Sequence, residues 1–483
     1  MPSLSKSLRW TLLLSTTAVL AACEVGPNYH RAPVETPPAF KEAEGWTPAQ
    51  PADGVDRGEW WTVFNDPLLN QLESQVRVSN QTLAADLAAY NEAHAIVAED
   101  QATLFPTVNL NSSAIQSKRG GTNQVTGTGA VVRGGAAVNE FEVEPSASWA
   151  PDVWGKIRRE VEVAKANAQA SYADLANARL SAQSTLAADY LELRMLDAEA
   201  VVLTKTGEAY KKSLAITRNQ YEAGTVSKSN VLQAETTLDN AQAGLTDLGV
   251  QRTASEHAIA VLIGKPPAEL TIPADPNWAP QPPATPTELP STLLQRRPDV
   301  AAAERAAASA SAQIGVQVAG FFPNITLTGD YGVASQTVSN LFNSSNVLYS
   351  IGASAAETVF DAGATRARVR QAKATRDQAV AEYRQTVLTA FQQVEDDLAA
   401  SRVLQNEEPQ RAAASEAADE EETVAFNEYR AGTVDYTTVV TAQAAALSAR
   451  QTLLTLQVQR MTTEVSLITA LGGGWSTKQL PKS

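Results

Sequence analysis

Few residues in this chain of 483 could support covalent or metal chemistry. It has one cysteine, Cys23, and three histidines, His30, His94 and His257. His30 lies in a proline-rich segment, and the other two histidines have no neighbour at a metal-ligand spacing. The glycine-rich stretch 120–135 lacks the Lys-Ser/Thr ending and the following helix of a phosphate-binding loop. The sequence therefore predicts no catalytic residue, no metal and no cofactor.

The lone cysteine fits the attachment of lipid instead. Residues 1–22 begin with two basic residues and continue as an apolar run that ends Leu-Ala-Ala directly before Cys23. This is the order of a secretory signal peptide, and the run is too short to span a bilayer. Leu-Ala-Ala-Cys resembles a bacterial lipobox, so Cys23 is the expected lipidated residue; the alternative is an ordinary signal peptide and a chance cysteine. In the lipoproteins that this resembles, a residue other than aspartate after the cysteine, here Glu24, favours the outer membrane.

Charge excludes one class of partner. The formal net charge is −15, and loss of the signal peptide removes Lys6 and Arg9 but no acid, which gives −17 for the mature chain. Such an acidic chain is not expected to bind nucleic acid. No stretch after the signal peptide reaches 18 apolar residues, so no transmembrane helix is expected.

The remaining sequence is organised as an internal repeat. The segment YEAGTV at Tyr221 returns as YRAGTV at Tyr429, 208 residues later. The same offset holds without a gap as far as Gly264 and Gly472. A second pair, LFPTVNL at Leu104 and FFPNITL at Phe321, is offset by 217 residues. The chain is therefore predicted to contain two copies of one structural unit.

Each copy reads as a helix, two strands and a long helical hairpin. Phe-Pro ends the first helix because proline clashes with the preceding turn, and glycine in Ala-Gly-Thr-Val ends the long helix. The stretch 156–220, without proline, predicts a rod of about 95 Å, whereas Pro409 predicts a break or kink in the second copy. The expected segments are a signal peptide (1–22), a lipidated tail (23–62), a first repeat (63–270; helix 66–104, strands about 105–118 and 138–150, hairpin 156–262), a proline-rich linker or equatorial segment (271–296), a second repeat (297–472; helix 297–320, strands about 322–334 and 347–360, hairpin 364–471) and a C-terminal tail (473–483).

The second helix of each hairpin has a seven-residue apolar pattern typical of a coiled coil. Alanine at many of these positions lets helix axes approach closely. A periplasmic coiled-coil scaffold or adaptor is one interpretation, but it leaves the strands and the signal peptide unexplained. The seam residues are Val231, Ala234, Leu238, Ala241, Leu245 and Leu248, then Val439, Ala442, Ala446, Ala449, Leu453 and Leu456.

The strands alternate between apolar and polar residues. In the strand that starts at Asn324, Ile325 and Leu327 share one face, and Asp330 falls on the other. In the strand near 140, three glutamates oppose Phe141 and Val143. This pattern suits a membrane barrel with lipid outside and water inside, although a half-buried sheet would show it too. Four strands cannot close a barrel, and an open edge in lipid is forbidden, so several chains would have to share one.

The chain resembles the outer-membrane efflux factor family, the TolC-like channels, and most closely its lipoprotein branch in resistance-nodulation-division systems, of the OprM/NodT-like type. The resemblance implies an α+β membrane protein. It further implies a homotrimer whose 12-stranded β-barrel, four strands per chain, would continue as a 12-helix periplasmic α-barrel with a mixed equatorial belt. The residues that carry it are the lipobox with CEVGPNYHRAP, WWTVFNDPLLNQL at 60–72, RRPDVAAAE at 296–304, the two Phe-Pro motifs, DVWGKIRR and FDAGATRARV before the long helices, and the duplicated Tyr-x-Ala-Gly-Thr-Val.

The resemblance also implies the function: the exit duct of a tripartite efflux pump for drugs or other toxic small molecules. Its partners would be a periplasmic adaptor, an inner-membrane pump and outer-membrane lipid. A duct for type I protein secretion or for metal-ion efflux is the alternative within the class. No enzymatic activity is expected.

Two groups of residues are candidates for a gate and a charge filter. The Ala-Gly-Thr-Val turns should be the periplasmic tips, where Asp435 would narrow the entrance and pair with Lys228 or Arg430; solvated turn residues are the alternative. Family members often have carboxylates after this turn, but this chain has Ser229, Asn230, Thr438 and Thr441. The candidate gate residues are Asp435, Arg430, Lys228, Tyr221, Tyr429, Thr438 and Thr441. The candidate lumen charge filter is Glu140, Glu142, Glu144 and Asp330, a set that would favour cations.

Overall fold

The computed structural model describes residues 24–37, 40–42, 59–118, 124–125, 131–132, 137–283 and 296–481. The expected signal peptide and lipidation site, 1–22 and Cys23, lie outside these residues. Parts of the tail, of the loop at 119–136 and of the proline-rich linker lie outside them as well.

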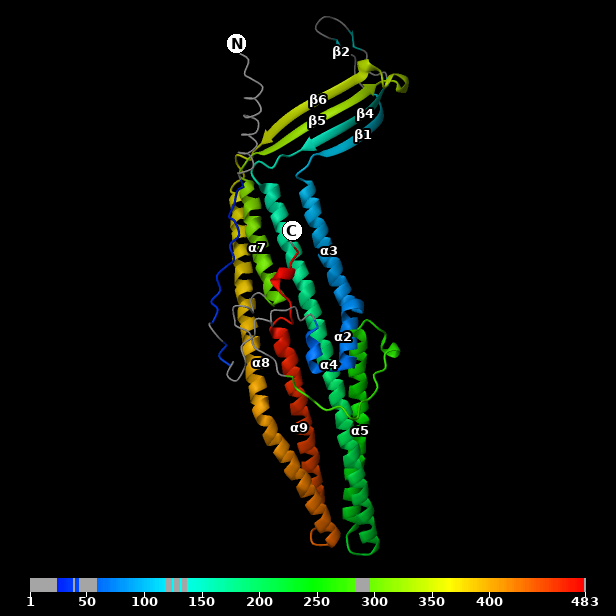
Figure 1. Cartoon of the computed structure of the whole chain (residues 1–483). Helices are drawn as coiled ribbons and strands as arrows, with labels where there is room; N and C mark the ends of the chain where they lie inside the picture. Colours follow the sequence, from blue (N-terminus) through cyan, green and yellow to red (C-terminus); the bar gives the residue numbers. More distant parts are fainter. Residues whose placement is uncertain are drawn as a thin grey trace.

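The chain is elongated, with a sheet at one end and long helices running away from it (Figure 1). The helices are α2 (Pro67–Ser79), α3 (Gln81–Ala102), α4 (Lys156–Glu222), α5 (Lys228–Leu262), α7 (Pro298–Ala319), α8 (Ala364–Ala431) and α9 (Tyr436–Ala470). The strands are β1 (Thr107–Ser117), β2 (Gln124–Val125), β3 (Val131–Val132), β4 (Val138–Trp149), β5 (Asn324–Ser335) and β6 (Val347–Ala356). Short 3-10 helices occur at η2 (Trp60–Phe64), η3 (Pro267–Glu269), η4 (Val338–Asn340), η5 (Ser344–Asn346) and η6 (Thr477–Gln479).

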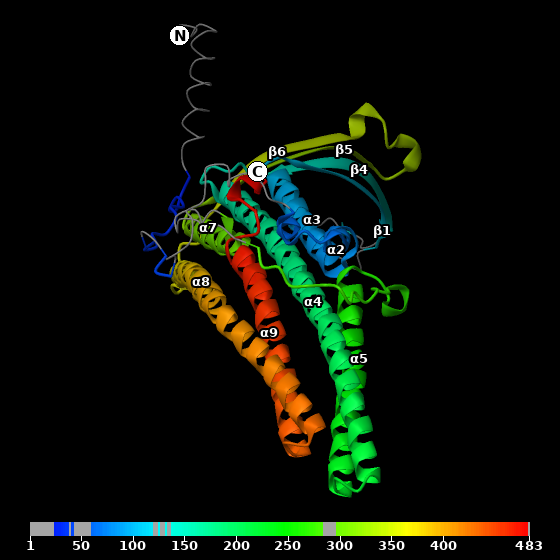
Figure 2. The ribbon, with the colours of Figure 1, turned by 60° about the horizontal axis from the view of Figure 1, so that its bottom comes forward.

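The two long helices dominate the molecule. α4 has 67 residues and α8 has 68, so each is about 100 Å long. Both end in the same turn. Gly224 and Gly432 have φ of 75°, and the next amide donates back to a carbonyl five residues earlier, from Thr225 to Gln220 and from Thr433 to Glu428. This left-handed glycine cap lets α5 and α9 return antiparallel, and Figure 2 shows both hairpin tips far from the sheet.

Two helices differ from the sequence-based expectation. The helix expected at 66–104 is interrupted at Asn80, whose side chain accepts a hydrogen bond from the Leu83 amide and donates one to the Leu262 carbonyl. Asn80 thereby ends α2, begins α3 and ties both to α5. Of the break or kink expected at Pro409, the break is absent, because α8 continues through this residue, whereas the axis of α8 does bend in its orange lower part (Figure 1). Pro409 is exposed, so water can satisfy the carbonyl that loses its donor.

The four long strands form one antiparallel sheet in the order β1-β4-β5-β6. The two repeats therefore meet at the β4–β5 pair. The ladder between these strands is interrupted at Glu144 and Pro145, because proline has no amide hydrogen to donate. Below the sheet, the upper parts of α3, α4, α7 and α8 pack in the same order as the strands, and α5 and α9 pack against α4 and α8 lower down.

Apolar clusters hold the helices together. The largest cluster joins Trp60 and Trp61 to α2, α4 and α5 about half-way along the molecule. A second cluster lies near the hairpin tips and contains Tyr210, Tyr429 and Tyr436 with the predicted seam residues. Most of that seam is buried, including Val231, Ala234, Leu238, Ala241, Leu248, Val439, Ala442, Ala446 and Leu456.

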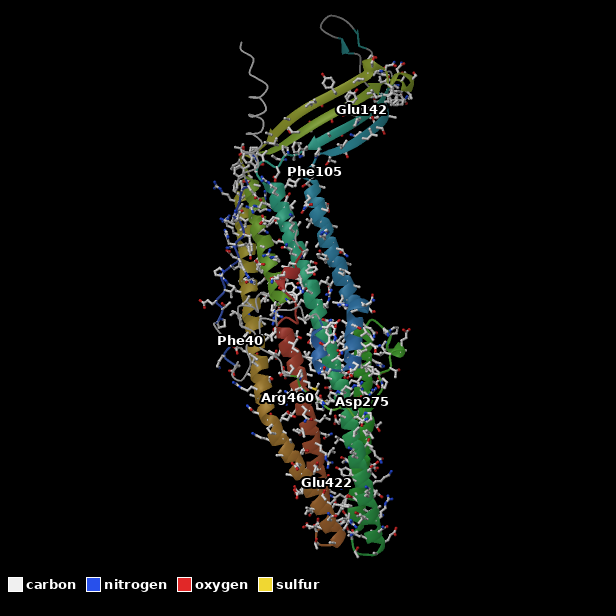
Figure 3. All side chains as sticks on the ribbon, viewed as in Figure 1. Phe40, Phe105, Glu142, Asp275, Glu422 and Arg460 are labelled. Atoms are coloured by element: carbon white, nitrogen blue, oxygen red, sulfur yellow. The ribbon has the colours of Figure 1, made fainter. Side chains whose placement is uncertain are left out.

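The described residues of the tail, 24–37 and 40–42, lie along the helices, and 24–37 form no helix or strand of their own. The Val25 amide donates to the Trp154 carbonyl just before α4, and Tyr29 donates to Glu304 of α7 at 2.6 Å. Farther along, Phe40 packs against Phe391 of α8 with ring centroids 6.3 Å apart. The described tail therefore runs from the sheet–helix junction down the helices (Figure 3).

None of the helices in the described ranges combines the length and the apolar character needed to cross a membrane.

Candidate functional site

The register of the sheet separates polar and apolar side chains onto opposite faces. Residues paired directly across antiparallel strands point to the same face. Ser146 of β4 pairs with Asp330 of β5, which pairs with Ser350 of β6. Glu144, two residues before Ser146, pairs with Asn111 of β1. All four candidate filter residues, Glu140, Glu142, Glu144 and Asp330, therefore lie on this polar face, where Asp330 accepts a hydrogen bond from the Ser350 hydroxyl at 2.7 Å.

The opposite face is apolar and uncovered. It carries Val108, Leu110, Phe141, Val143, Trp149, Ile325, Leu327, Tyr331, Val333, Val347, Tyr349 and Ile351. Ile351 is 88% exposed and Tyr349 75%. An apolar sheet face without a covering layer is not stable in water, and it matches the lipid-facing band of a membrane barrel.

Gly332 allows β4 and β5 to approach beside the glutamates. A Cβ atom at this position would lie 2.7 Å from the Val143 carbonyl oxygen and 3.0 Å from the Glu144 Cα. Both are backbone atoms, which cannot move aside without disturbing the ladder.

We expect Gly332→Ala to destabilise the assembled sheet by about 1–3 kcal/mol, the usual cost of overpacking. The measurement is the temperature of dissociation of the native oligomer. Samples are incubated at a series of temperatures, and the remaining oligomer is read on a gel. Gly329→Ala is the control, because the nearest atom to its Cβ would be 4.0 Å away. Equal midpoints for the two variants would contradict the steric argument.

At the tips, the candidate gate residues have different environments. Asp435 is the N-cap of α9 and accepts a hydrogen bond from the Thr438 amide at 3.3 Å. Among the described residues of one chain it forms no ion pair with Lys228 or Arg430, so the expected pairing is not present within the protomer. Lys228, Arg430, Thr438 and Thr441 are exposed, and the Thr441 hydroxyl donates to the carbonyl of Thr437.

The two tyrosines among the candidate gate residues also differ. Tyr429 is 2% exposed, shares a hydrogen bond of 2.9 Å with the Thr217 hydroxyl of α4, and packs against Tyr436 with ring centroids 5.4 Å apart. Tyr221, its equivalent in the first repeat, is 44% exposed. Only Tyr429 therefore joins one hairpin to the other.

Further contacts near the tips, between the hairpins and within the second one, were not predicted. Gln443 of α9 donates to the Ser213 hydroxyl of α4 at 3.0 Å. Arg450 of α9 donates to Asp419 and Glu422 of α8, both at 2.7 Å, and reaches Thr206 of α4 at 3.4 Å. Figure 3 shows Glu422 in the lower part of α8. The spacing Tyr436, Val439, Gln443, Ala446 continues the seam, and this was the available signal for Tyr436 and Gln443.

Half-way along the molecule, a buried ionic network fastens the segment after α5. Asp197 of α4 accepts hydrogen bonds from Arg194 at 2.9 Å, Arg252 at 2.7 Å and the Asp275 amide at 3.1 Å. Arg194 and Arg252 also donate to the carbonyls of Pro273 and Ile272, both in that segment. Figure 3 shows Asp275 beside the middle of the helices. The start of the predicted equatorial segment is thus held by these charged groups together with the largest apolar cluster, in which Ile272 is buried and against which Trp278 packs.

A polar cavity of ≈ 400 Å³ lies between α4, α7, α8 and α9, nearer the sheet than the Asp197 network. Arg297, Asp299, Asp396 and Asp397 line it. Burial, with smaller contributions from Asp396 and Glu464, raises the pKa of Asp397 to about 6. Asp397 therefore gains a proton in mildly acidic solution. Within the described part of the chain, no group of three or more His, Cys, Asp or Glu residues is arranged to hold a metal ion.

A membrane-type sheet continued by long antiparallel hairpins defines the class of TolC-like outer-membrane channels. The chain belongs to the outer membrane efflux protein family, whose model matches it twice, over residues 72–265 and 289–473. The double match confirms the predicted repeat.

Individual relatives agree with this assignment. The probable efflux pump outer membrane protein TtgC of Pseudomonas putida is 30% identical over 486 residues, which cover 98% of this chain and 96% of the relative. The cation efflux system protein CusC of Escherichia coli is 29% identical over 464 residues, 94% of this chain and 96% of the relative. The solved structure of the outer-membrane channel OprN has a TM-score of 0.86 at 30% identity, over 94% of this chain and 100% of that chain. The protein is an outer-membrane efflux transport protein.

Proposed function

We propose that this protein is the exit duct of a tripartite efflux pump, in which three copies form one channel through the outer membrane and the periplasm. The observation that carries this proposal is a four-stranded sheet with an uncovered apolar face and two unpaired edge strands, β1 and β6. Lipid cannot satisfy the free backbone groups of an edge strand, so β6 of one copy would pair with β1 of the next.

The helices support the same closure. α3 and α8 are the outer members of the helix layer. α3 lies on the side of the edge strand β1, and α8 lies on the side of the edge strand β6. One rotation would therefore join β6 to β1 and α8 to α3 together. Two copies would give eight strands and three would give twelve; we propose three, the number that the family resemblance implies, with a 12-helix α-barrel below the sheet.

We also propose that Cys23 carries lipid. Two residues after Cys23, the tail is fixed at the sheet–helix junction, where the Val25 amide donates a hydrogen bond to the Trp154 carbonyl. Cys23 would therefore emerge close to the bilayer surface. A periplasmic adaptor and an inner-membrane pump complete the proposed assembly. A coiled-coil scaffold would not need the uncovered apolar sheet, so we do not retain that alternative.

The cargo is proposed to be small molecules. The related proteins are named for toluene, antibiotic, pyoverdine and cation efflux, so similar ducts serve chemically different cargoes. This agrees with a conduit whose pump selects the substrate.

The test is the conductance of the detergent-purified protein in a planar bilayer, together with its native mass. Discrete conductance steps from a species of three chains are expected. A monomer or dimer without steps would overturn the proposal.

The gate role of Asp435 is tested by separating its charge from its capping function. If a ring of Asp435 carboxylates restricts the entrance, Asp435→Ala and Asp435→Asn should both raise the single-channel conductance. If Asp435 only caps α9, Asn should conduct like the wild type, because asparagine caps equally well, whereas alanine loses about 1 kcal/mol of helix stability. The matched control is Ser227→Ala at the equivalent position of the first repeat, whose side chain makes no capping hydrogen bond.

A further inference from the structure

The junction between the sheet and the helices marks one edge of the bilayer. Phe105 lies there (Figure 3) and is exposed. Val359 and Phe360, between β6 and α8, are also exposed, Phe360 by 86%. Aromatic residues of this kind flank the apolar band of membrane barrels at the interface. The first turns of α8 therefore lie directly on the periplasmic side of that interface.

Three cations occupy one face of these turns. Arg366, Arg370 and Lys373 are spaced by four and three residues, so they share a face of α8. All three are exposed, and within the described residues none has a carboxylate oxygen within 4.0 Å. Lys373 lies about 14 Å along the axis from the start of α8. Helical side chains lean towards the N-terminus of their helix, which brings these charges closer to the membrane.

The equivalent helix of the first repeat provides an internal comparison. At the start of α4, Lys156 pairs with Glu160 at 3.6 Å, Arg158 with Asp152 at 3.1 Å, and Arg159 with Glu162 at 2.6 Å. Lys165 of α4, the position 208 residues before Lys373, has no carboxylate partner among the described residues either, so this level holds one unpaired cation on α4 and three on the basic face of α8. The unpaired positive charge is therefore greater in the second repeat, because Arg366 and Arg370 correspond to the paired Arg158 and to Glu162 of α4.

The basic face of α8 is also the face along which the tail runs. Phe391, which packs against Phe40 of the tail, lies five helical turns below Lys373 on that face. The tail leads back towards the proposed lipid anchor, so this face lies outside the tunnel and under the bilayer. Figure 3 shows Phe40 beside α8.

A cavity of ≈ 580 Å³ adjoins Lys373 between the tail, α7 and α8. One wall is apolar, with Ile314, Val318 and Val369. Its polar lining includes His30 and Asn28 of the tail, and Arg376 and Asp377, which neutralise each other at 2.9 Å. The cavity therefore combines an apolar wall with the unpaired charge of Lys373.

We propose that this basic face binds the anionic headgroup of a phospholipid in the periplasmic leaflet. Arg366, Arg370 and Lys373 contact the phosphate, and the apolar wall of the cavity receives the glycerol and the first methylenes. Unpaired cations next to an interface attract anionic lipid, and an amphipathic cavity suits a lipid better than free phosphate. The inference rests on the proposed insertion of the sheet into the bilayer, and a trimer would carry three such sites.

The test uses the purified wild-type trimer in neutral detergent, titrated separately with phosphatidylglycerol, phosphatidylethanolamine and inorganic phosphate. The readouts are the lipids retained in native mass spectrometry and the temperature of trimer dissociation. We expect selective retention of phosphatidylglycerol and a raised midpoint. The variant R366Q/R370Q/K373Q should lose about fivefold in affinity per removed cation, on the order of 100-fold in all.

The matched control is K205Q/K211Q/K212Q, which removes three exposed lysines from the lower half of α4. Equal losses in the two variants would overturn the site in favour of general charge attraction, and equal binding of inorganic phosphate would overturn the lipid assignment. A wild-type trimer that conducts but shows no preference for phosphatidylglycerol would overturn this inference and leave the channel intact. If no conducting trimer forms, the proposed function fails, and this inference fails with it.

Discussion

Asp197→Ala is expected to lower the free energy of unfolding of the helical part by about 3–5 kcal/mol, the typical effect of breaking a buried ion pair from one side. The Asp197 side chain is 2% exposed, and its loss leaves the guanidinium groups of Arg194 and Arg252 without their shared carboxylate. The Asp275 amide would lose its acceptor as well. The measurement is the thermal midpoint of the helical circular-dichroism signal.

A local readout separates this network from general destabilisation. Chymotrypsin should cut after Leu270 or Trp278 faster in Asp197→Ala, because the network holds this segment against α4 and α5. Asp377→Ala is the control: its pair with Arg376 is exposed on both sides, and exposed pairs contribute about 0–1 kcal/mol. An unchanged midpoint together with unchanged cleavage in Asp197→Ala would contradict a holding role.

The second large effect concerns ion selectivity. If the polar face of the sheet lines the lumen, a trimer holds about twelve carboxylates from Glu140, Glu142, Glu144 and Asp330. Such rings favour cations. The wild-type channel should therefore give a cation-selective reversal potential in a salt gradient, and E140Q/E142Q/E144Q should shift that potential towards zero.

The charge-conserving variant E140D/E142D/E144D is the matched control, and it should keep the wild-type selectivity. Anion selectivity of the wild-type protein would refute the filter. A glutamine variant as selective as the wild type would instead assign the selectivity to other residues along the tunnel.

Patterns that depend on local geometry could be predicted from the sequence. Alternation of period two separated Glu142 from Val143, and pairing across four strands then kept all the acidic residues of these strands on one face. The glycine turns at 224 and 432 could be predicted because few other residues tolerate their positive φ. Both depend on neighbours a few residues apart.

Contacts that depend on how two helices, distant in sequence, are aligned along their axes could not be predicted. Thr217 and Tyr429 are 212 residues apart, and their hydrogen bond depends on the full lengths of α4 and α8. The same holds for Arg450 and Thr206. The split at Asn80 was missed because asparagine is compatible with a helix interior, and only the nearby carbonyl of Leu262 makes it a cap on both sides. The expected pairing of Asp435 is absent within the protomer for a local reason, since its carboxylate accepts from the Thr438 amide three residues away.

The two unpaired edges of the sheet also bear on biogenesis. The helices of one protomer have cores of their own, so they can fold while the chain is still alone in an aqueous compartment. The sheet cannot reach its final state until its edges meet those of other copies, so its stability depends on protomer concentration. A lipid tether at Cys23 would confine newly exported protomers to the membrane plane, and encounters in two dimensions would shorten the time for which an aggregation-prone strand edge stays exposed.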